Sequence, residues 1–224
     1  ILVSGSMAIM YVVTFFAYDF YDLFPQSFAF ALLFIFTAFT VFSAIQYNRQ
    51  VIAHFGLVGA YAIPFILSNN SGNIEFLFSF IMVVNLGILV VAYFKNWKPL
   101  LYVSTGITWT IASAWYLSEY EPSRFGFVAL FFTLIFVLFY VMYLLPKTIK
   151  KIKFRVDDVL LILTNSFVFF GFGIHALGET SFGDEFLGLF TLCNGIIHFI
   201  VAFIIYKKDL ADKKLFHLIA GLVL

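Results

Sequence analysis

Long uncharged apolar runs follow one another along almost the whole chain, separated by short polar connections. Eight runs fall in the range of about 17 to 25 residues that an α-helix needs to cross roughly 30 Å of hydrocarbon. The eight predicted spans lie at residues 2–18, 27–45, 51–67, 76–94, 99–117, 125–146, 158–177 and 186–206. A ninth apolar run occupies residues 215–224, so we expect a truncated ninth span and a fragment of a longer chain. The pattern predicts an all-α, polytopic transmembrane helical bundle.

Composition excludes a water-soluble globule. Residues of the AVILMFWYC set make up 63% of the 224 residues and charged residues only 11%, whereas soluble domains have about 45–50% and about 25%. The net charge of +1 provides no basic field for nucleic acid, so no nucleic-acid partner is expected. The single cysteine, Cys193, excludes an internal disulfide and a cysteine-based metal site.

Basic residues alternate between the connections and predict the direction of insertion. Arg124 is the only basic residue in the connections after the odd-numbered spans, and the other twelve of the 13 Lys and Arg residues follow the even-numbered spans. These twelve are Arg49, Lys95, Lys98, Lys147, Lys150, Lys151, Lys153, Arg155, Lys207, Lys208, Lys213 and Lys214. Because Lys and Arg in short loops stay on the cytoplasmic side, we expect a cytoplasmic N-terminus and eight crossings of a bacterial cytoplasmic (inner) membrane.

Two sequence matches favour an internal repeat. The pattern P-x-x-F-x-F-x-x-L-F occurs at 25–34 and again at 122–131, and Glu-Phe-Leu opens the spans at 75–77 and 185–187. We interpret this as a tandem four-helix unit. Residues 1–117 would hold the first unit and the start of the second, and residues 99–206 the second unit, within one membrane domain. Coincidence in a chain with 33 Phe is the alternative.

Polar residues deep within the spans are the candidates for chemistry, because hydrocarbon offers them no partners. They are Asn85, Asn165, Asn194 and His198. Asn194 and His198 are four residues apart and share a helix face, and Asn85 and Asn194 correspond in the repeat. One interpretation is a substrate path near mid-membrane at the junction of two repeats. The other is packing, in which these groups hydrogen-bond between neighbouring helices.

Catalysis is not expected. No G-x-x-x-x-G-K-[ST], H-E-x-x-H or G-x-S-x-G pattern occurs, and no acidic residue lies deep in a span. We therefore expect no enzyme, no cofactor and no metal site. The preferred hypothesis is a carrier or flippase-like protein for a small or lipid-linked molecule, with membrane lipids as partners. The alternative is a non-catalytic scaffold or assembly subunit whose basic loop, 147–155, touches anionic lipid headgroups.

Several segments resemble one family. The segments are Ser4–Tyr11, Tyr21–Pro25, Gly56–Pro64 and Leu77–Phe80, together with Trp97. They are similar to the uncharacterised bacterial multi-pass membrane proteins of domain-of-unknown-function family 2339, most closely over residues 4–117. The first segment has Ser-Gly-Ser where the family suggests a richer glycine run. The resemblance implies a long chain with many spans, and it implies no activity and no catalytic residue.

Overall fold

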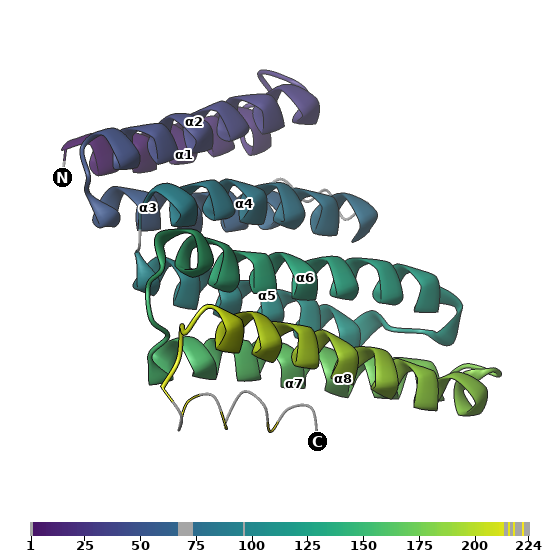
Figure 1. The fold of residues 1–224 in the computed structure, drawn as a ribbon. Coiled ribbons are helices and arrows are strands. Elements are labelled where there is room, and N and C mark those ends of the chain that lie inside the picture. Colours follow the sequence, from purple (N-terminus) through teal and green to yellow (C-terminus); the bar gives the residue numbers. More distant parts are fainter. Residues whose placement is uncertain are drawn as a thin grey trace. The chain divides into compact units, whose positions relative to one another are not determined.

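The structure is a computed structural model that describes residues 2–66, 74–95 and 97–212, together with Leu215, His217 and Gly221. All regular elements in these residues are helical (Figure 1). Apart from the last three residues named, the expected ninth span at 215–224 lies outside the described residues.

Each of the eight predicted spans is found as an α-helix, with ends that agree within four residues. The helices are α1 (Leu2–Asp19), α2 (Gln26–Gln46), α3 (Gln50–Ile66), α4 (Ile74–Phe94), α5 (Lys98–Glu119), α6 (Phe125–Lys150), α7 (Val156–Gly178) and α8 (Gly183–Lys207). A short 3-10 helix, η1 (Pro122–Arg124), precedes α6. The largest difference is at α6, which continues for one turn past Pro146 to Lys150.

Among the residues that the structure describes, five helices are long and apolar enough to cross a membrane. They are α2, α4, α6, α7 and α8. In α3, the apolar segment that the structure describes, Gln50–Ala62, is shorter than these five. The helices α1 and α5 fall outside this set, and α5 carries several Ser, Thr and Trp residues among its apolar ones. Large apolar side chains nevertheless point outward along the helices, including Phe39 at 51% and Leu117 at 79% exposure. Surfaces of this kind are stable in hydrocarbon and not in water.

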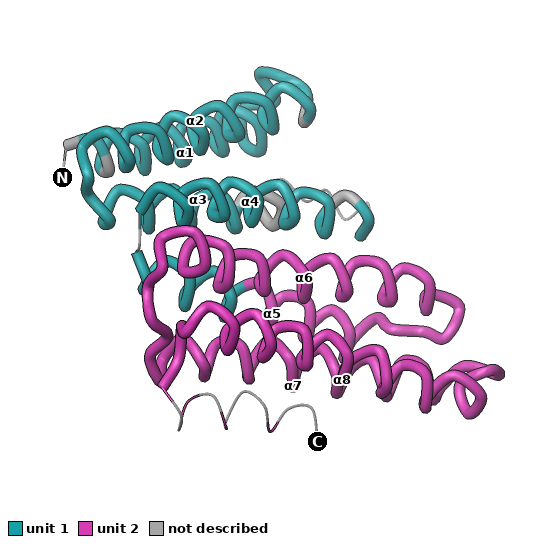
Figure 2. The backbone as a smooth tube through the Cα atoms, in the orientation of Figure 1, with its two compact units in different colours: residues 1–107 teal, residues 108–224 magenta. Residues whose placement is uncertain are grey.

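The chain forms two compact units, residues 1–107 and residues 108–224, which we call unit 1 and unit 2 (Figure 2). Their boundary lies inside α5, the helix shared by the two sequence units predicted above. The tandem duplication itself stays a prediction. The two units are described separately below.

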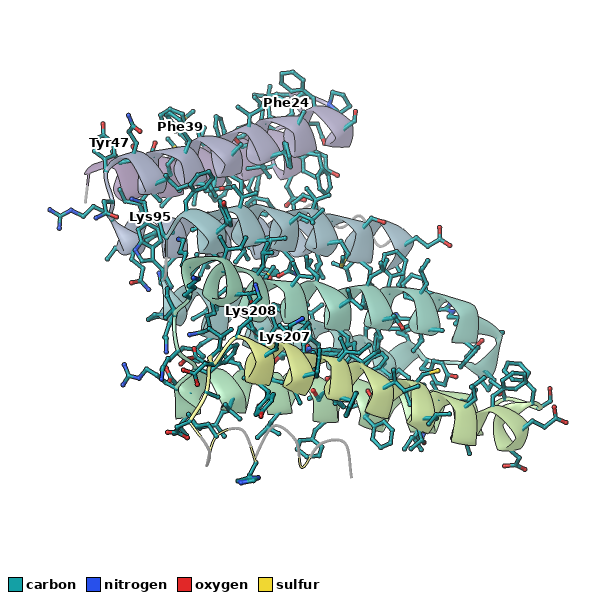
Figure 3. All side chains as sticks on the ribbon, in the orientation of Figure 1. Phe24, Phe39, Tyr47, Lys95, Lys207 and Lys208 are labelled. Carbon is teal, nitrogen blue, oxygen red and sulfur yellow. The ribbon has the colours of Figure 1, made fainter. Side chains whose placement is uncertain are left out.

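Unit 1 is held together by close approach of α2 and α3. A Cβ atom at Gly56 would lie 2.8 Å from Thr40 Cγ2, so only glycine allows this contact. Ala29, Leu33 and Phe80 form a buried cluster between α2 and α4. Figure 3 shows Tyr47 and Lys95, which follow α2 and α4, at one end of the unit, with Phe24 toward the other. The charged and aromatic residues therefore mark the ends of the helices.

Unit 2 is built around α6. Of the residues in the apolar segment that includes α6, 50% are buried, against 33% in α7 and 28% in α8. Its aromatic side chains fill the core, with Phe136 and Phe139 both fully buried. The Phe136 ring stacks on Phe169 of α7 at 4.2 Å between centroids. The helix α8 packs mainly against α7 and is the more exposed of the two.

The two ends of unit 2 carry opposite charge. At one end, the backbone N–H of Phe154 donates to Leu210 O at 2.6 Å and joins the α6–α7 connection to the residues after α8. At the other end, the Phe125 ring contacts Phe182 at 5.5 Å and joins the start of α6 to the α7–α8 connection. The first end carries seven basic residues, Lys147, Lys150, Lys151, Lys153, Arg155, Lys207 and Lys208, the last two labelled in Figure 3, against four acidic ones, Asp157, Asp158, Asp209 and Asp212. The second end carries Glu119, Glu121, Glu179, Asp184 and Glu185, with Arg124 as its basic residue.

A buried ion pair lies at the basic end of unit 2. Lys147 Nζ lies 2.8 Å from Asp158 Oδ2, and both side chains are at most 7% exposed. Asp158 also accepts the backbone N–H of Arg155 at 2.8 Å, which caps the start of α7. The ammonium group of Lys147 lies 5.1 Å from the Phe154 ring centroid. The end of α6, the connection and the start of α7 are thus fixed to one another.

We expect Lys147→Met to destabilise the protein strongly, because it leaves the Asp158 carboxylate buried without a cation. The cost should be about 3–5 kcal/mol in the free energy of unfolding, measured by denaturation of the detergent-solubilised protein. Lys153→Met is the control, since the ion pair of Lys153 with Asp209 is 3.7 Å long and largely exposed. Adding Asp158→Leu to Lys147→Met should restore most of the loss. Equal stability of the two single variants would contradict the assignment.

Candidate functional site

Asn85 forms its hydrogen bonds within unit 1. Its side chain is 1% exposed. Asn85 Oδ1 accepts from the Tyr61 hydroxyl at 3.0 Å, and Asn85 Nδ2 donates to Ile81 O at 3.0 Å. The amide therefore joins α4 to α3, as expected for a polar group that packs two helices together.

Asn165 joins three helices of unit 2. It is fully buried on α7. Its Oδ1 accepts from Trp109 Nε1 of α5 at 2.9 Å, and its Nδ2 donates to Phe136 O of α6 at 3.1 Å. Both ends of the amide are occupied by protein groups.

His198 belongs to a second buried set in unit 2. Its Nδ1 lies 2.6 Å from the Tyr140 hydroxyl of α6, which lies 2.8 Å from Ser166 Oγ of α7. Ser166 Oγ donates to Ile162 O at 2.7 Å, so its lone pairs remain for the Tyr140 proton. The Tyr140 oxygen then accepts from His198, which places a proton on Nδ1. This chain of hydrogen bonds connects α8, α6 and α7.

Asn194 differs from the other three predicted residues. It is partly buried on α8, and its Oδ1 is enclosed with no hydrogen-bond partner among the described residues. It lies one turn before His198 on the same helix, as the spacing predicted. Asn194 is thus the one member of the predicted set with an amide oxygen available to another group.

The sequence prediction found these residues but not their partners. Asn165 and His198 both lie about 14 Å from the basic end of their helices, at 1.5 Å per residue. Trp109, Tyr140 and Ser166, which hold them, were missed, because hydropathy does not show which Tyr or Trp faces a neighbouring helix. Since Asn85 bonds within unit 1, the assignment of all four residues to one substrate path stays a prediction.

A hollow lies elsewhere in unit 2, between α5 and α7. Its volume is about 640 Å³. Its lining includes Tyr116 and Tyr120 from α5 and its end, and Phe167, Gly171 and His175 from α7. A cavity of this size is typical of small-molecule sites. We call it the α5–α7 cavity.

The α5–α7 cavity is polar at one end and apolar at the other. The rings of Tyr116 and Tyr120 stack at 4.4 Å, and the Tyr116 hydroxyl lies 2.8 Å from His175 Nδ1. The Tyr120 hydroxyl donates to Ala176 O at 3.0 Å. Phe167 lies about 16 Å from the end of α7, at 1.5 Å per residue, and so lines the apolar end.

Electrostatics at the polar end favour the neutral phenol of Tyr120, which follows the last residue of α5. Burial raises the pKa of Tyr120, and the Glu179 carboxylate raises it further. The hydroxyl thus stays a hydrogen-bond donor throughout the neutral pH range. Among the described residues, no three His, Cys, Asp or Glu side chains gather closely enough to hold a metal ion.

We expect Tyr140→Phe to destabilise unit 2 while preserving its packing. The variant removes two interhelical hydrogen bonds and leaves His198 Nδ1 without its acceptor, at a cost of about 1–3 kcal/mol. Thermal denaturation in detergent measures the loss, with Tyr47→Phe as the control because Tyr47 is 61% exposed. Unchanged stability of Tyr140→Phe would show that the set contributes nothing to packing.

Comparison with known proteins places the chain in a family. The family model described as "Predicted membrane protein (DUF2339)" matches residues 1–223, well beyond the segments that first suggested it. No curated protein and no solved structure matches the chain. The apolar helices of both units agree with this description. The chain therefore belongs to the DUF2339 family of predicted membrane proteins.

Proposed function

We propose that the protein is a carrier or flippase-like protein that binds an amphiphilic molecule, small or lipid-linked, in the α5–α7 cavity. The observation that supports this proposal is the polarity gradient along the cavity. A headgroup would lie beside Tyr116 and Tyr120, and an apolar chain beside Phe167. This orientation matches that of an amphiphile in one leaflet of a bilayer.

The rim of the cavity favours entry from the bilayer. Phe167 and Leu117, both on its lining, are 64% and 79% exposed. An apolar rim exposed to this extent lets a lipid chain slide in without crossing water. The hydrogen bonds of Asn165 and His198 then serve as a rigid frame behind the cavity, and Asn194 is the remaining candidate from the predicted path.

The scaffold alternative rests on the basic end of unit 2. Lys150 and Lys151 are exposed there, at the end of the unit where anionic headgroups would lie. Lys147 is not, because it is buried against Asp158. A scaffold role would explain the basic end, but it would give the cavity no role. We therefore prefer the carrier hypothesis to the scaffold hypothesis.

The same proposal includes eight crossings of a bacterial cytoplasmic membrane and a tandem pair of four-helix units. Helices of 17 to 26 residues occur at all eight predicted positions. In unit 2, the described basic residues other than Arg124 gather at one end, in agreement with the positive-inside rule. Whether the protein crosses the membrane eight times depends on whether α1, α3 and α5 each cross it.

Reporter fusions test the crossings. Alkaline phosphatase, which is active only outside the cytoplasm, should be inactive after Lys95 and Lys150 and active after Glu121 and Thr180. Phosphatase activity after Lys95 equal to that after Glu121 would show that α5 does not cross. Activity after Lys150 would overturn the direction of insertion.

Lipid translocation tests the carrier. Vesicles containing the purified protein and lipids with a fluorescent nitrobenzoxadiazole group on an acyl chain should expose inner-leaflet lipid to dithionite faster than protein-free vesicles. Phosphatidylethanolamine, phosphatidylcholine and phosphatidylglycerol serve as probes. Gly171→Leu should reduce the rate to that of protein-free vesicles, because Gly171 lines the cavity and has open space at its Cβ position.

Gly188→Leu is the matched control for Gly171→Leu. Gly188 also has open space at its Cβ position, and it lies on α8 away from the cavity lining. This variant should keep the translocation rate of the unmodified protein. If no probe moves faster than in protein-free vesicles, the carrier proposal is wrong.

A further inference from the structure

We infer that the α5–α7 cavity selects amphiphiles with an exposed ammonium headgroup, such as an aminophospholipid, over anionic ones. This inference rests on the proposed binding of an amphiphile in the cavity and adds the chemical class of its headgroup. It is carried by three features of unit 2: the charges around the polar end, the stacked tyrosines and the absence of basic side chains on the described lining.

The polar end of the cavity lies at the acidic end of unit 2. The connections at this end of the unit carry five carboxylates against the single guanidinium of Arg124; they are Glu119, Glu121, Glu179, Asp184 and Glu185. Glu179 lies close enough to Tyr116 and Tyr120 to act on both electrostatically. Charges at an interface act over about 8–10 Å at physiological ionic strength, so a cation is attracted to the polar end and an anion is repelled.

The partly exposed ring of Tyr120, stacked on the buried ring of Tyr116, gives an ammonium group a contact surface. The planes of Tyr116 and Tyr120 are 14° from parallel at a centroid distance of 4.4 Å, and both residues line the cavity. An ammonium group within about 6 Å of such a ring face is attracted by the ring quadrupole. The Tyr116 hydroxyl adds a hydrogen-bonding atom beside the rings, held in place by His175.

An anionic headgroup finds no matching group on the described lining. The lining contains neither Lys nor Arg. Removing a phosphate or carboxylate from water without a basic partner is costly. In a zwitterionic lipid, the ammonium neutralises the phosphate of the same headgroup, and the molecule as a whole carries no net charge to the acidic end.

The size of the cavity fits this part of a lipid. A volume of about 640 Å³ holds a headgroup with the first part of its acyl chains and not a whole phospholipid. The rest of the chains would extend past Phe167 into the bilayer. Recognition is thus confined to the headgroup and the glycerol region, which is where the three features lie.

Native mass spectrometry of the full chain, released from detergent after incubation with lipids of identical acyl chains, tests the inference. The probes are phosphatidylethanolamine, phosphatidylglycerol and diacylglycerol. We expect phosphatidylethanolamine to be retained about two- to fivefold more than either of the others, as an exposed cation–π contact predicts. Gly171→Leu should abolish the preference, and Gly188→Leu should keep it.

Glu179→Gln isolates the charge, because an exposed side chain is changed without altering its shape. This variant should lower the preference for phosphatidylethanolamine over phosphatidylglycerol. Glu185→Gln should lower it less, because Glu179 and not Glu185 acts electrostatically on Tyr116 and Tyr120. If the unmodified chain retains all three lipids equally, and Gly171→Leu retains none of them, the headgroup selection is overturned and the amphiphile site is left intact. Preferential retention of phosphatidylglycerol would also overturn it. Retention that is the same in Gly171→Leu and the unmodified chain would overturn the site itself.

Discussion

Hydrocarbon offers no hydrogen-bond partner, and this constraint governs the structure. Helices satisfy the backbone, so a polar side chain within a span is costly unless it finds a partner on another helix or on its own preceding turn. Asn85, Asn165 and His198 do so, whereas Asn194 Oδ1 has no partner among the described residues. The same hydrogen bonds decide which helices lie together, because an amide or imidazole in this setting specifies its neighbour in a way that a Leu or Phe does not.

In unit 2, this constraint makes α6 the central helix. Asn165 bonds to its backbone at Phe136, His198 and Ser166 both meet its Tyr140, and Asp158 meets its Lys147. The three interactions are spread along the helix from mid-span to its basic end. The α5–α7 cavity lies outside this set, because the hydrogen bonds at its polar end, Tyr116 to His175 and Tyr120 to Ala176, join α7 to α5 and its end.

The fold was largely predictable from the sequence, and the site was not. Apolar runs gave all eight helices because the length of a crossing is set by the bilayer. The buried amides were also found, since Asn within a span is costly unless paired. The Lys147–Asp158 pair was missed because a Lys at the end of a span usually reaches the interface. The cavity was missed because hydropathy carries no information on which helices pair, or on where their side chains leave space.

The long sequence separation of the buried hydrogen bonds has a consequence for biogenesis. Trp109 and Asn165 are 56 residues apart, and Tyr140 and His198 are 58 apart. At a synthesis rate of about 5–20 residues per second, each first partner is made roughly 3–12 s before its second. During that interval the Trp109 indole N–H has no final acceptor, and the Tyr140 phenol oxygen has no final donor. The insertion machinery must therefore keep α5 and α6 beside water or polar protein until α7 and α8 emerge, so that the last two helices complete the assembly of the first two.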